Sequence, residues 1–121
     1  MNLSDYNQIM EYIEQNFLGI PLKIEVTAGD GPDNLVYHGK LDDVLFELDR
    51  GLTHKRVPVN QDTTPDIRLK FGELEILLSG HELRLGSVYD WSLSNPADSG
   101  KYLLCNELDK SLMVYIEKEK K

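Results

Sequence analysis

The sequence predicts an α+β fold, in which an N-terminal amphipathic helix packs on a curved and mainly antiparallel β-sheet. Two observations favour this class. Apolar residues near the N-terminus recur with the period of a helix, whereas along most of the remaining chain they alternate with polar residues, as in a strand with one wet face. Residues 66–88 hold the densest alternating runs, and we interpret them as a meander at the centre of the sheet. Partial closure of this sheet into a barrel is an alternative, because closure removes exposed edges.

The length of 121 residues is typical of one domain, so we predict a single domain over residues 1–121. It divides into the helix at about residues 4–18, a β-rich remainder at about 22–117 and a charged tail at 118–121 that frays. No apolar run approaches the roughly 20 residues of a transmembrane helix, and the start of the chain lacks the basic and apolar blocks of a secretory signal. These absences, together with a single cysteine, predict a cytoplasmic protein.

The helix is the clearest element of the sequence. Its apolar residues follow the i, i+3, i+4, i+7, i+11 spacing of a stripe that lies on a core, and they are Tyr6, Ile9, Met10, Ile13 and Phe17. Ser4 is in position to cap this helix, and Asp5 falls in the first turn, where the helix dipole favours an anion. Gly19 is placed to end the helix.

A hairpin follows the helix. Alternation of apolar and charged residues predicts a strand at 22–26, and the run at 35–40 resumes the strand pattern. Turn-forming residues fill 29–34, so we expect these two strands to pair. Within the later meander, Gly72 and the pair Ser79-Gly80 are expected to separate the strands.

Residues 41–52 fit the period of a helix and also that of a strand. The helix pattern leaves Phe46 off the apolar face, so we favour a strand. It is predicted to continue through a turn into an edge strand at 55–59, because Pro58 cannot donate to a neighbouring strand.

Residues 102–116 show the same ambiguity between a helix and a pair of strands. The β-branched residues Val114 and Ile116 favour the pair of strands, joined as a hairpin. The preceding segment 94–100 has the most loop-like composition in the chain and is predicted to be a mobile loop.

The formal net charge of −8 is unevenly distributed. Residues 1–50 carry ten acids against three bases, a balance of −7, whereas residues 51–121 carry eleven acids against ten bases, a balance of −1. This distribution argues against nucleic-acid binding, which needs clustered Lys and Arg to displace counterions. It predicts instead an acidic surface that binds a basic protein partner, formed by Glu11, Glu14, Asp42, Asp43, Glu47 and Asp49.

No residue pattern commits the chain to a chemistry. The three histidines stand alone in their segments and away from Cys105, so no zinc-ligand spacing occurs. Cys105 lies in an apolar run, where a thiol is usually inert. No nucleophile elbow, dinucleotide fingerprint or phosphate loop is present. We therefore predict no catalytic residue, no metal and no cofactor, and a protein that is not an enzyme.

Two further surface features carry hypotheses. Tyr89, Trp91 and Tyr102 flank the predicted loop at 94–100, and aromatic residues beside a mobile loop form a candidate recognition site. The basic run at 53–56 is expected to block sheet-to-sheet association along an edge strand.

The function predicted from these features is that of a non-catalytic binding protein of the inhibitor, immunity or adaptor type. Two alternatives stay open. One is a subunit of a homo-oligomer whose strands pair across chains. The other is a small-ligand module with a cavity inside the curved sheet, lined by the aromatic residues Tyr37, Phe46, Phe71, Tyr89 and Trp91. No membrane or nucleic-acid partner is expected. A helix followed by a meander is shared by many unrelated small bacterial and phage proteins, so the layout does not fix a function.

Overall fold

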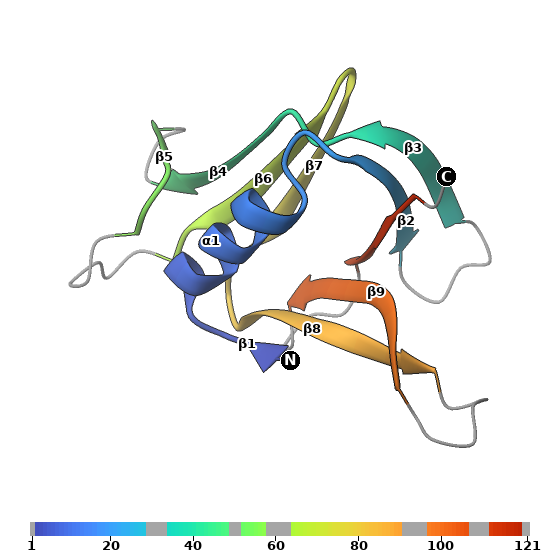
Figure 1. The fold of residues 1–121 in the computed structure, drawn as a ribbon. Coiled ribbons are helices and arrows are strands. Elements are labelled where there is room, and N and C mark those ends of the chain that lie inside the picture. The colour runs from blue at the N-terminus through green and yellow to red at the C-terminus, as the bar shows by residue number, and fades with distance from the viewer. Residues whose placement is uncertain are drawn as a thin grey trace.

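The fold consists of one short helix and ten strands over the described residues (Figure 1). A computed structural model describes residues 2–28, 34–48, 52–57, 64–90, 97–106 and 112–119. In chain order the elements are β1 (Asn2–Leu3), α1 (Tyr6–Asn16), β2 (Pro21–Ala28), β3 (Asn34–Lys40), β4 (Asp43–Leu48), β5 (Leu52–His54), β6 (Asp66–Phe71), β7 (Leu74–Ser79), β8 (Leu83–Asp90), β9 (Ala97–Asn106) and β10 (Leu112–Lys118).

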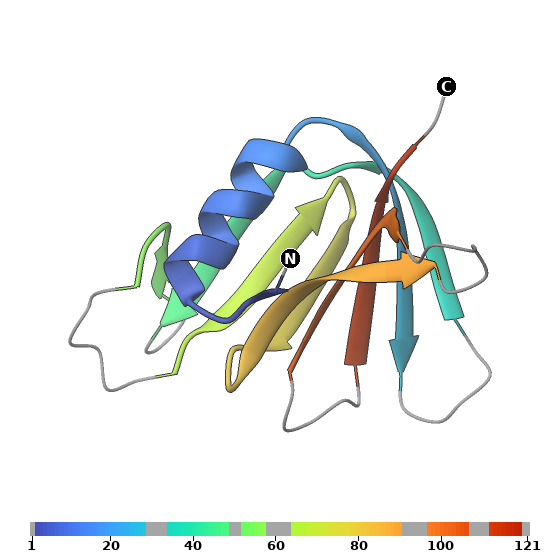
Figure 2. The same cartoon turned by 60° about the horizontal axis from the view of Figure 1, so that its bottom comes forward.

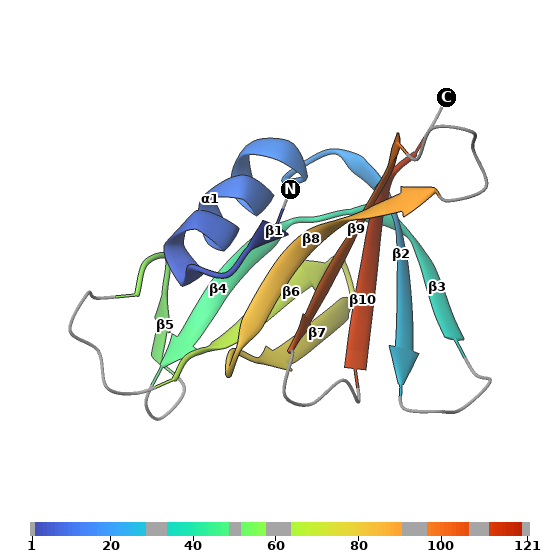
Figure 3. The same ribbon diagram turned by 90° about the horizontal axis from the view of Figure 1, so that it is seen from below.

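The strands form two antiparallel sheets, which confirms the predicted mixture of a helix with antiparallel strands. The larger sheet has the order β1-β8-β9-β10-β2-β3, and the smaller has the order β5-β4-β6-β7. Figure 3 shows the two sheets side by side, with β3 at the rim of the larger one. Over the described residues the strands do not close into a barrel. No helix in these ranges is long and apolar enough to cross a membrane.

The predicted central meander is wrong in one respect. Strands β6 and β7 pair as a hairpin across Gly72, but β8 leaves them and pairs with β1 and β9 in the other sheet. The change of sheet occurs at Gly80, where an added Cβ would lie 1.8 Å from the carbonyl oxygen of Pro65. Because only glycine allows this close approach, the chain can turn sharply there and enter the second sheet.

The core lies between the helix and the inner faces of both sheets. Helix α1 contacts β4 of the smaller sheet and β8 of the larger one, and Figure 2 shows it running alongside β4. Its fully buried residues are Ile9, Met10 and Ile13, and Phe17 follows directly after it. Phe46 and Phe71 supply large buried rings from the smaller sheet, while Ile24, Leu104 and Val114 come from the larger one. The helix therefore ties the two sheets to a common core.

The helix begins and ends inside its predicted limits of 4–18. Asp5, and not Ser4, is the N-cap, since its carboxylate accepts a hydrogen bond of 3.0 Å from the backbone N–H of Gln8. Gly19 has a φ of +74° and its N–H donates to the carbonyl of Leu41 at 2.9 Å, so the chain has left the helix by this residue, as predicted.

Both ambiguous segments are strands, and the three predicted hairpins are confirmed: β2 pairs with β3, β4 with β5, and β9 with β10. Two boundaries differ from the prediction. The edge strand is Leu52–His54, and residues 55–57 of the predicted strand 55–59 do not belong to it, because the chain bends at 55 and 56; residues 58 and 59 lie outside the described residues. Residues 97–100 of the predicted loop belong to β9, since pairing with β8 extends the strand through them. Residues 94–96 lie outside the described residues.

The first two residues of the segment predicted as a charged tail are described, and residues 120 and 121 lie outside the described residues. Lys118 is the last residue of β10, and the N–H of Glu119 donates to the carbonyl of Pro21 at 3.0 Å. Pairing with β2 therefore holds the chain in place through Glu119.

Candidate interaction surface

The outer face of the smaller sheet carries most of its charge. Alternation along β4, β6 and β7 turns one set of side chains into the core and the other outward. We call the outward set the charged face. It consists of three rows across the strands: Asp43, Lys70 and Glu75; Leu45, Arg68 and Leu77; and Glu47, Asp66 and Ser79.

Arg68 lies at the centre of the charged face, with a leucine on each side. Its guanidinium forms an ion pair with Glu47 on β4 and another, at 2.8 Å, with Glu75 on β7. The Arg68 side chain is 27% exposed, so its stem is covered while its charge reaches both carboxylates. Arg68 thus holds two acids of neighbouring strands in fixed positions around an apolar centre.

Lys55 connects the helix to the edge of this sheet. Its ammonium group pairs with Asp43, lies 3.9 Å from a carboxylate oxygen of Glu14, and donates to the carbonyl of Val44 at 2.9 Å. Burial raises the pKa of the Asp43 carboxyl, but the hydrogen bonds from Lys55 and the Val44 N–H and the charges of Lys55 and Lys70 outweigh it. The pKa of Asp43 is therefore lowered, and its carboxylate is the favoured form.

The six acids predicted to bind a partner are divided between places. Asp43 and Glu47 lie on the charged face, and Glu14 is brought next to Asp43 by Lys55. Glu11 is exposed on the helix and accepts a hydrogen bond from Gln15. Asp42 turns to the β6–β7 hairpin, where it accepts from the N–H of Gly72. Asp49 lies outside the described residues.

The predicted aromatic site can be placed only through Tyr102. Its hydroxyl accepts a hydrogen bond of 3.1 Å from Tyr12, and its ring centroid lies 5.3 Å from that of Phe17. Tyr102 therefore takes part in the contact between the helix and the larger sheet. The side chains of Tyr89 and Trp91 lie outside the described part of the structure.

Asn7 is a positioning residue that sequence analysis missed. Its side-chain amide donates to the carbonyl of Val57 at 2.9 Å and accepts from the N–H of Val57 at 2.8 Å. The amide thus replaces a neighbouring strand for the residues that follow β5 and fixes them to the helix. An asparagine on the polar side of a helix gives no signal of such a contact in the sequence.

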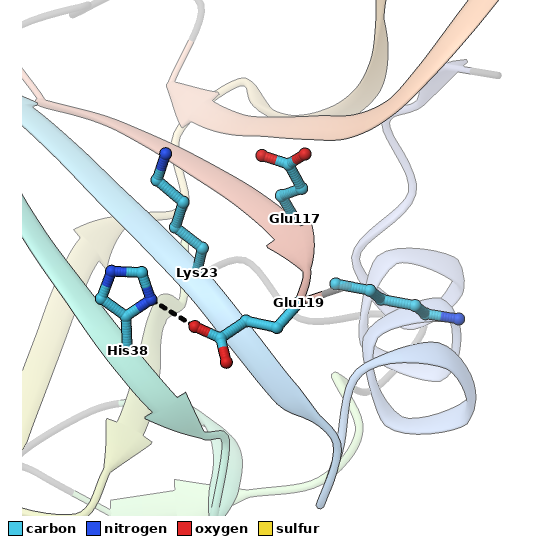
Figure 4. Close-up of a pocket in the computed structure, with 5 residues that line it drawn as sticks. Lys23, His38, Glu117 and Glu119 are labelled. Atoms are coloured by element: carbon cyan, nitrogen blue, oxygen red, sulfur yellow. Dashed lines mark hydrogen bonds and ion pairs between the residues drawn. The ribbon is translucent and has the colours of Figure 1, made fainter. Parts of the chain in front are cut away.

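An open pocket of about 370 Å³ lies on the larger sheet, where β2, β3 and β10 meet. It is lined by Lys23, His38, Glu117, Lys118 and Glu119, and Figure 4 shows Glu119 reaching across β2 to His38, with which it forms a hydrogen bond. The lining is charged on all sides, in contrast to the apolar walls typical of small-molecule sites. Within the described ranges, no three His, Cys, Asp or Glu residues are grouped so that they could hold a metal ion.

Comparisons with protein families, with curated proteins and with solved structures found no match to this chain.

Proposed function

We propose that this protein is a non-catalytic interaction domain that binds a basic protein partner through its charged face. The observation that carries the proposal is the composition of that face: two leucines beside a fixed arginine at the centre, and four carboxylates around them. An apolar centre with a charged rim is the usual arrangement of a protein–protein interface. Leu77 is 47% exposed, so the centre is open to a partner.

Charge favours a basic partner. The charged face has four acids against Arg68 and Lys70, and the whole chain has a net charge of −8. Such a field accelerates the approach of a positive surface and repels a negative one. Because Arg68 already holds Glu47 and Glu75 in place, little side-chain entropy is lost when a partner lysine or arginine reaches them. Proteins of the inhibitor, immunity and adaptor types act in this way.

The small-ligand alternative finds less support. Of the aromatic residues expected to line a cavity, Phe46 and Phe71 are fully buried in the core, and the ring of Tyr37 packs edge-on against Phe71. These rings contact the protein itself, so they leave no aromatic wall for a ligand at those positions.

The test is a titration of the ¹⁵N-labelled protein with a short oligolysine peptide, followed by NMR. We expect the largest amide shifts in β4, β6 and β7, with an affinity that falls steeply as salt is added. Two double variants separate a local site from net charge, since both remove the same two charges. Glu47→Gln with Glu75→Gln should weaken binding, whereas Glu73→Gln with Glu82→Gln, in exposed turns, should leave it nearly unchanged. Equal weakening by both variants, or shifts spread over both sheets, would overturn the proposal.

A further inference from the structure

The edge strand β3 has one free side. Its seven residues pair with β2, and no other strand of the described residues pairs with its second side. Neither side chain at its start is covered: Leu35 is 51% exposed and Val36 is 47% exposed. A long edge strand with exposed apolar residues is a template for pairing with another chain.

The register identifies the backbone groups on the free side. The carbonyl of Pro21 accepts from Glu119, so Pro21 directs its backbone toward β10. Because backbone direction alternates along a strand, Leu22, Ile24 and Val26 face β3, where their partners are Gly39, Tyr37 and Leu35. The remaining residues of β3, which are Asn34, Val36, His38 and Lys40, therefore present their backbone groups to the free side.

We propose that a second copy of this chain pairs with this edge, with the two β3 strands antiparallel and Tyr37 opposite Tyr37 of the second copy. In this register all seven residues find partners. Val36 lies opposite His38 of the second copy. The N–H and C=O groups of both residues point toward the other strand, so the two residues can exchange hydrogen bonds. A two-fold axis through the Tyr37 pair makes the contact self-complementary, which is the commonest symmetry of a homodimer. The two larger sheets then form one continuous sheet.

Charge complementarity supports this occupant and this register. The amide of Asn34 donates to the carboxylate of Glu25 at 3.0 Å, which places that carboxylate on the outer face close to the free edge. Asn34 lies opposite Lys40 of the second copy, and Lys40 shares this face, since it is six residues further along the strand. Its ammonium group therefore reaches Glu25, and the two-fold axis forms the pair twice.

Shape complementarity on the other face agrees. Leu35 lies opposite Gly39 of the second copy, the one residue of β3 that has no side chain. Within one chain the ring of Tyr37 lies over Gly39, since an added Cβ would be 2.6 Å from it. The exposed Leu35 side chain thus meets the ring of Tyr37 of the second copy, and burying it against that ring is favourable.

The first test is analytical ultracentrifugation of the purified full chain. We expect a dimer whose population grows with protein concentration. Val36→Pro should give a monomer, because the lost N–H lies on the free side. At low protein concentration, where the native chain is also monomeric, the two should unfold near the same temperature. The matched control Val36→Thr keeps the N–H and the branched side chain, and should still dimerise. A wild-type monomer at about millimolar concentration, or a Val36→Pro dimer, would overturn the proposal.

The second test is a charge swap. Adding salt would not give a clear result, because salt weakens the Lys40–Glu25 attraction and also the repulsion between two chains that each have a net charge of −8. Lys40→Glu alone and Glu25→Lys alone should each weaken dimerisation about tenfold or more. The double variant Glu25→Lys with Lys40→Glu should recover part of the loss, since the pair is restored with reversed sign while Lys101, 3.9 Å from the Glu25 carboxylate, stays beside position 25. A double variant as weak as the single ones contradicts this register. The edge is separate from the charged face, so this outcome leaves the proposed function unaffected.

Discussion

The sheet edges at β5 and β3 differ: the chain beyond β5 is bonded to neighbouring side chains, whereas the outer side of β3 is open over the described residues. Strand β5 has three residues, and beyond it Lys55 occupies the carbonyl of Val44 while Asn7 occupies both backbone groups of Val57. Strand β3 has seven residues, and no described side chain bonds to its free backbone groups. Both edges nevertheless expose a leucine, 63% for Leu52 and 51% for Leu35. The two edges therefore do not differ in the exposure of apolar side chains. They differ in strand length and in whether side chains form hydrogen bonds with backbone groups at the edge.

The comparison teaches that a short, blocked edge and a long, open one can occur in one small domain. Proteins usually block edges to avoid association with other chains. In this domain β5 ends after three residues, and Asn7 and Lys55 bond the backbone beyond it, whereas β3 continues for seven residues; pairing with another chain is therefore favoured at β3 over β5. The open edge is consistent with a specific contact along β3.

The largest effect is expected where the blocked edge meets the core. Phe46 on β4 is fully buried and packs edge-on against Tyr6, with ring centroids 6.0 Å apart. Phe46→Ala should lower the free energy of unfolding by about 3–5 kcal/mol, because it leaves a cavity. Leu52→Ala on the neighbouring β5 should cost less than about 0.5 kcal/mol, because that side chain is exposed. Urea denaturation measures both, and equal losses would show that β5 carries more of the stability than its exposure indicates.

The next prediction separates the two sides of β3 by proline substitution. Leu35→Pro removes an N–H that faces β2, and should cost about 3 kcal/mol. Val36→Pro removes an N–H on the free side, and should cost less than about 1 kcal/mol for the monomer. The native side chains are almost equally exposed, so the difference isolates the backbone. Thermal unfolding at low protein concentration is the measurement. A larger cost for Val36→Pro would mean that the two sides of β3 are assigned the wrong way round, and similar costs would mean that the direction of the N–H does not decide the loss.

A smaller loss is expected from the helix contact that blocks the residues after β5. Asn7→Ala leaves the N–H and C=O of Val57 without their partner, which should cost about 2 kcal/mol. Hydrogen exchange at the Val57 amide should accelerate together with this loss. Gln8→Ala, one position along the exposed side of the helix, is the control and should change neither quantity measurably. An unchanged Val57 exchange rate in Asn7→Ala would show that another group protects this segment.

The elements themselves were largely predictable, because they rest on local patterns. A helix lies where its period predicted one, with Ile9, Met10 and Ile13 buried, and the period-two runs are strands. The choice of a strand at 41–52 rested on Phe46, which indeed points into the core. Secondary structure followed from the sequence to the extent that each segment buries one face.

The assignment of strands to sheets was not predictable. The passage from β7 to β8 depends on the close approach of Gly80 to Pro65, residues that are fifteen positions apart. A glycine after a strand reads equally well as a simple hairpin turn. The predicted acidic site was divided for the same reason: Asp42 and Asp43 are neighbours in the sequence, but alternation sends them to different partners, Gly72 and Lys55. Asn7 and Arg68 gained their roles from contacts across the fold that no local spacing encodes.

The smallest predicted effect concerns Lys55 and the pH dependence of the blocked edge. Because the pKa of Asp43 is lowered on folding, its carboxylate contributes stability that is present above the unfolded pKa and is lost as the pH falls through the folded pKa. Lys55→Gln removes the positive charge but retains a donor for the carbonyl of Val44. Without that charge, burial of the Asp43 carboxyl is opposed less strongly, and its pKa should rise.

Lys55→Gln should therefore cost up to about 1 kcal/mol at neutral pH, the range of a partly exposed ion pair. The difference from the native protein should disappear once the pH has fallen through the folded pKa of Asp43, where its carboxyl is protonated in both proteins. Urea denaturation at several pH values measures the first effect, and an NMR titration of the Asp43 carboxyl measures the second. Arg56→Gln, at the adjacent exposed position, controls for the loss of one positive charge. If the Asp43 pKa stays the same in Lys55→Gln, then Lys55 acts on this edge only through its hydrogen bond to the Val44 carbonyl, and its ion pair with Asp43 does not contribute to stability.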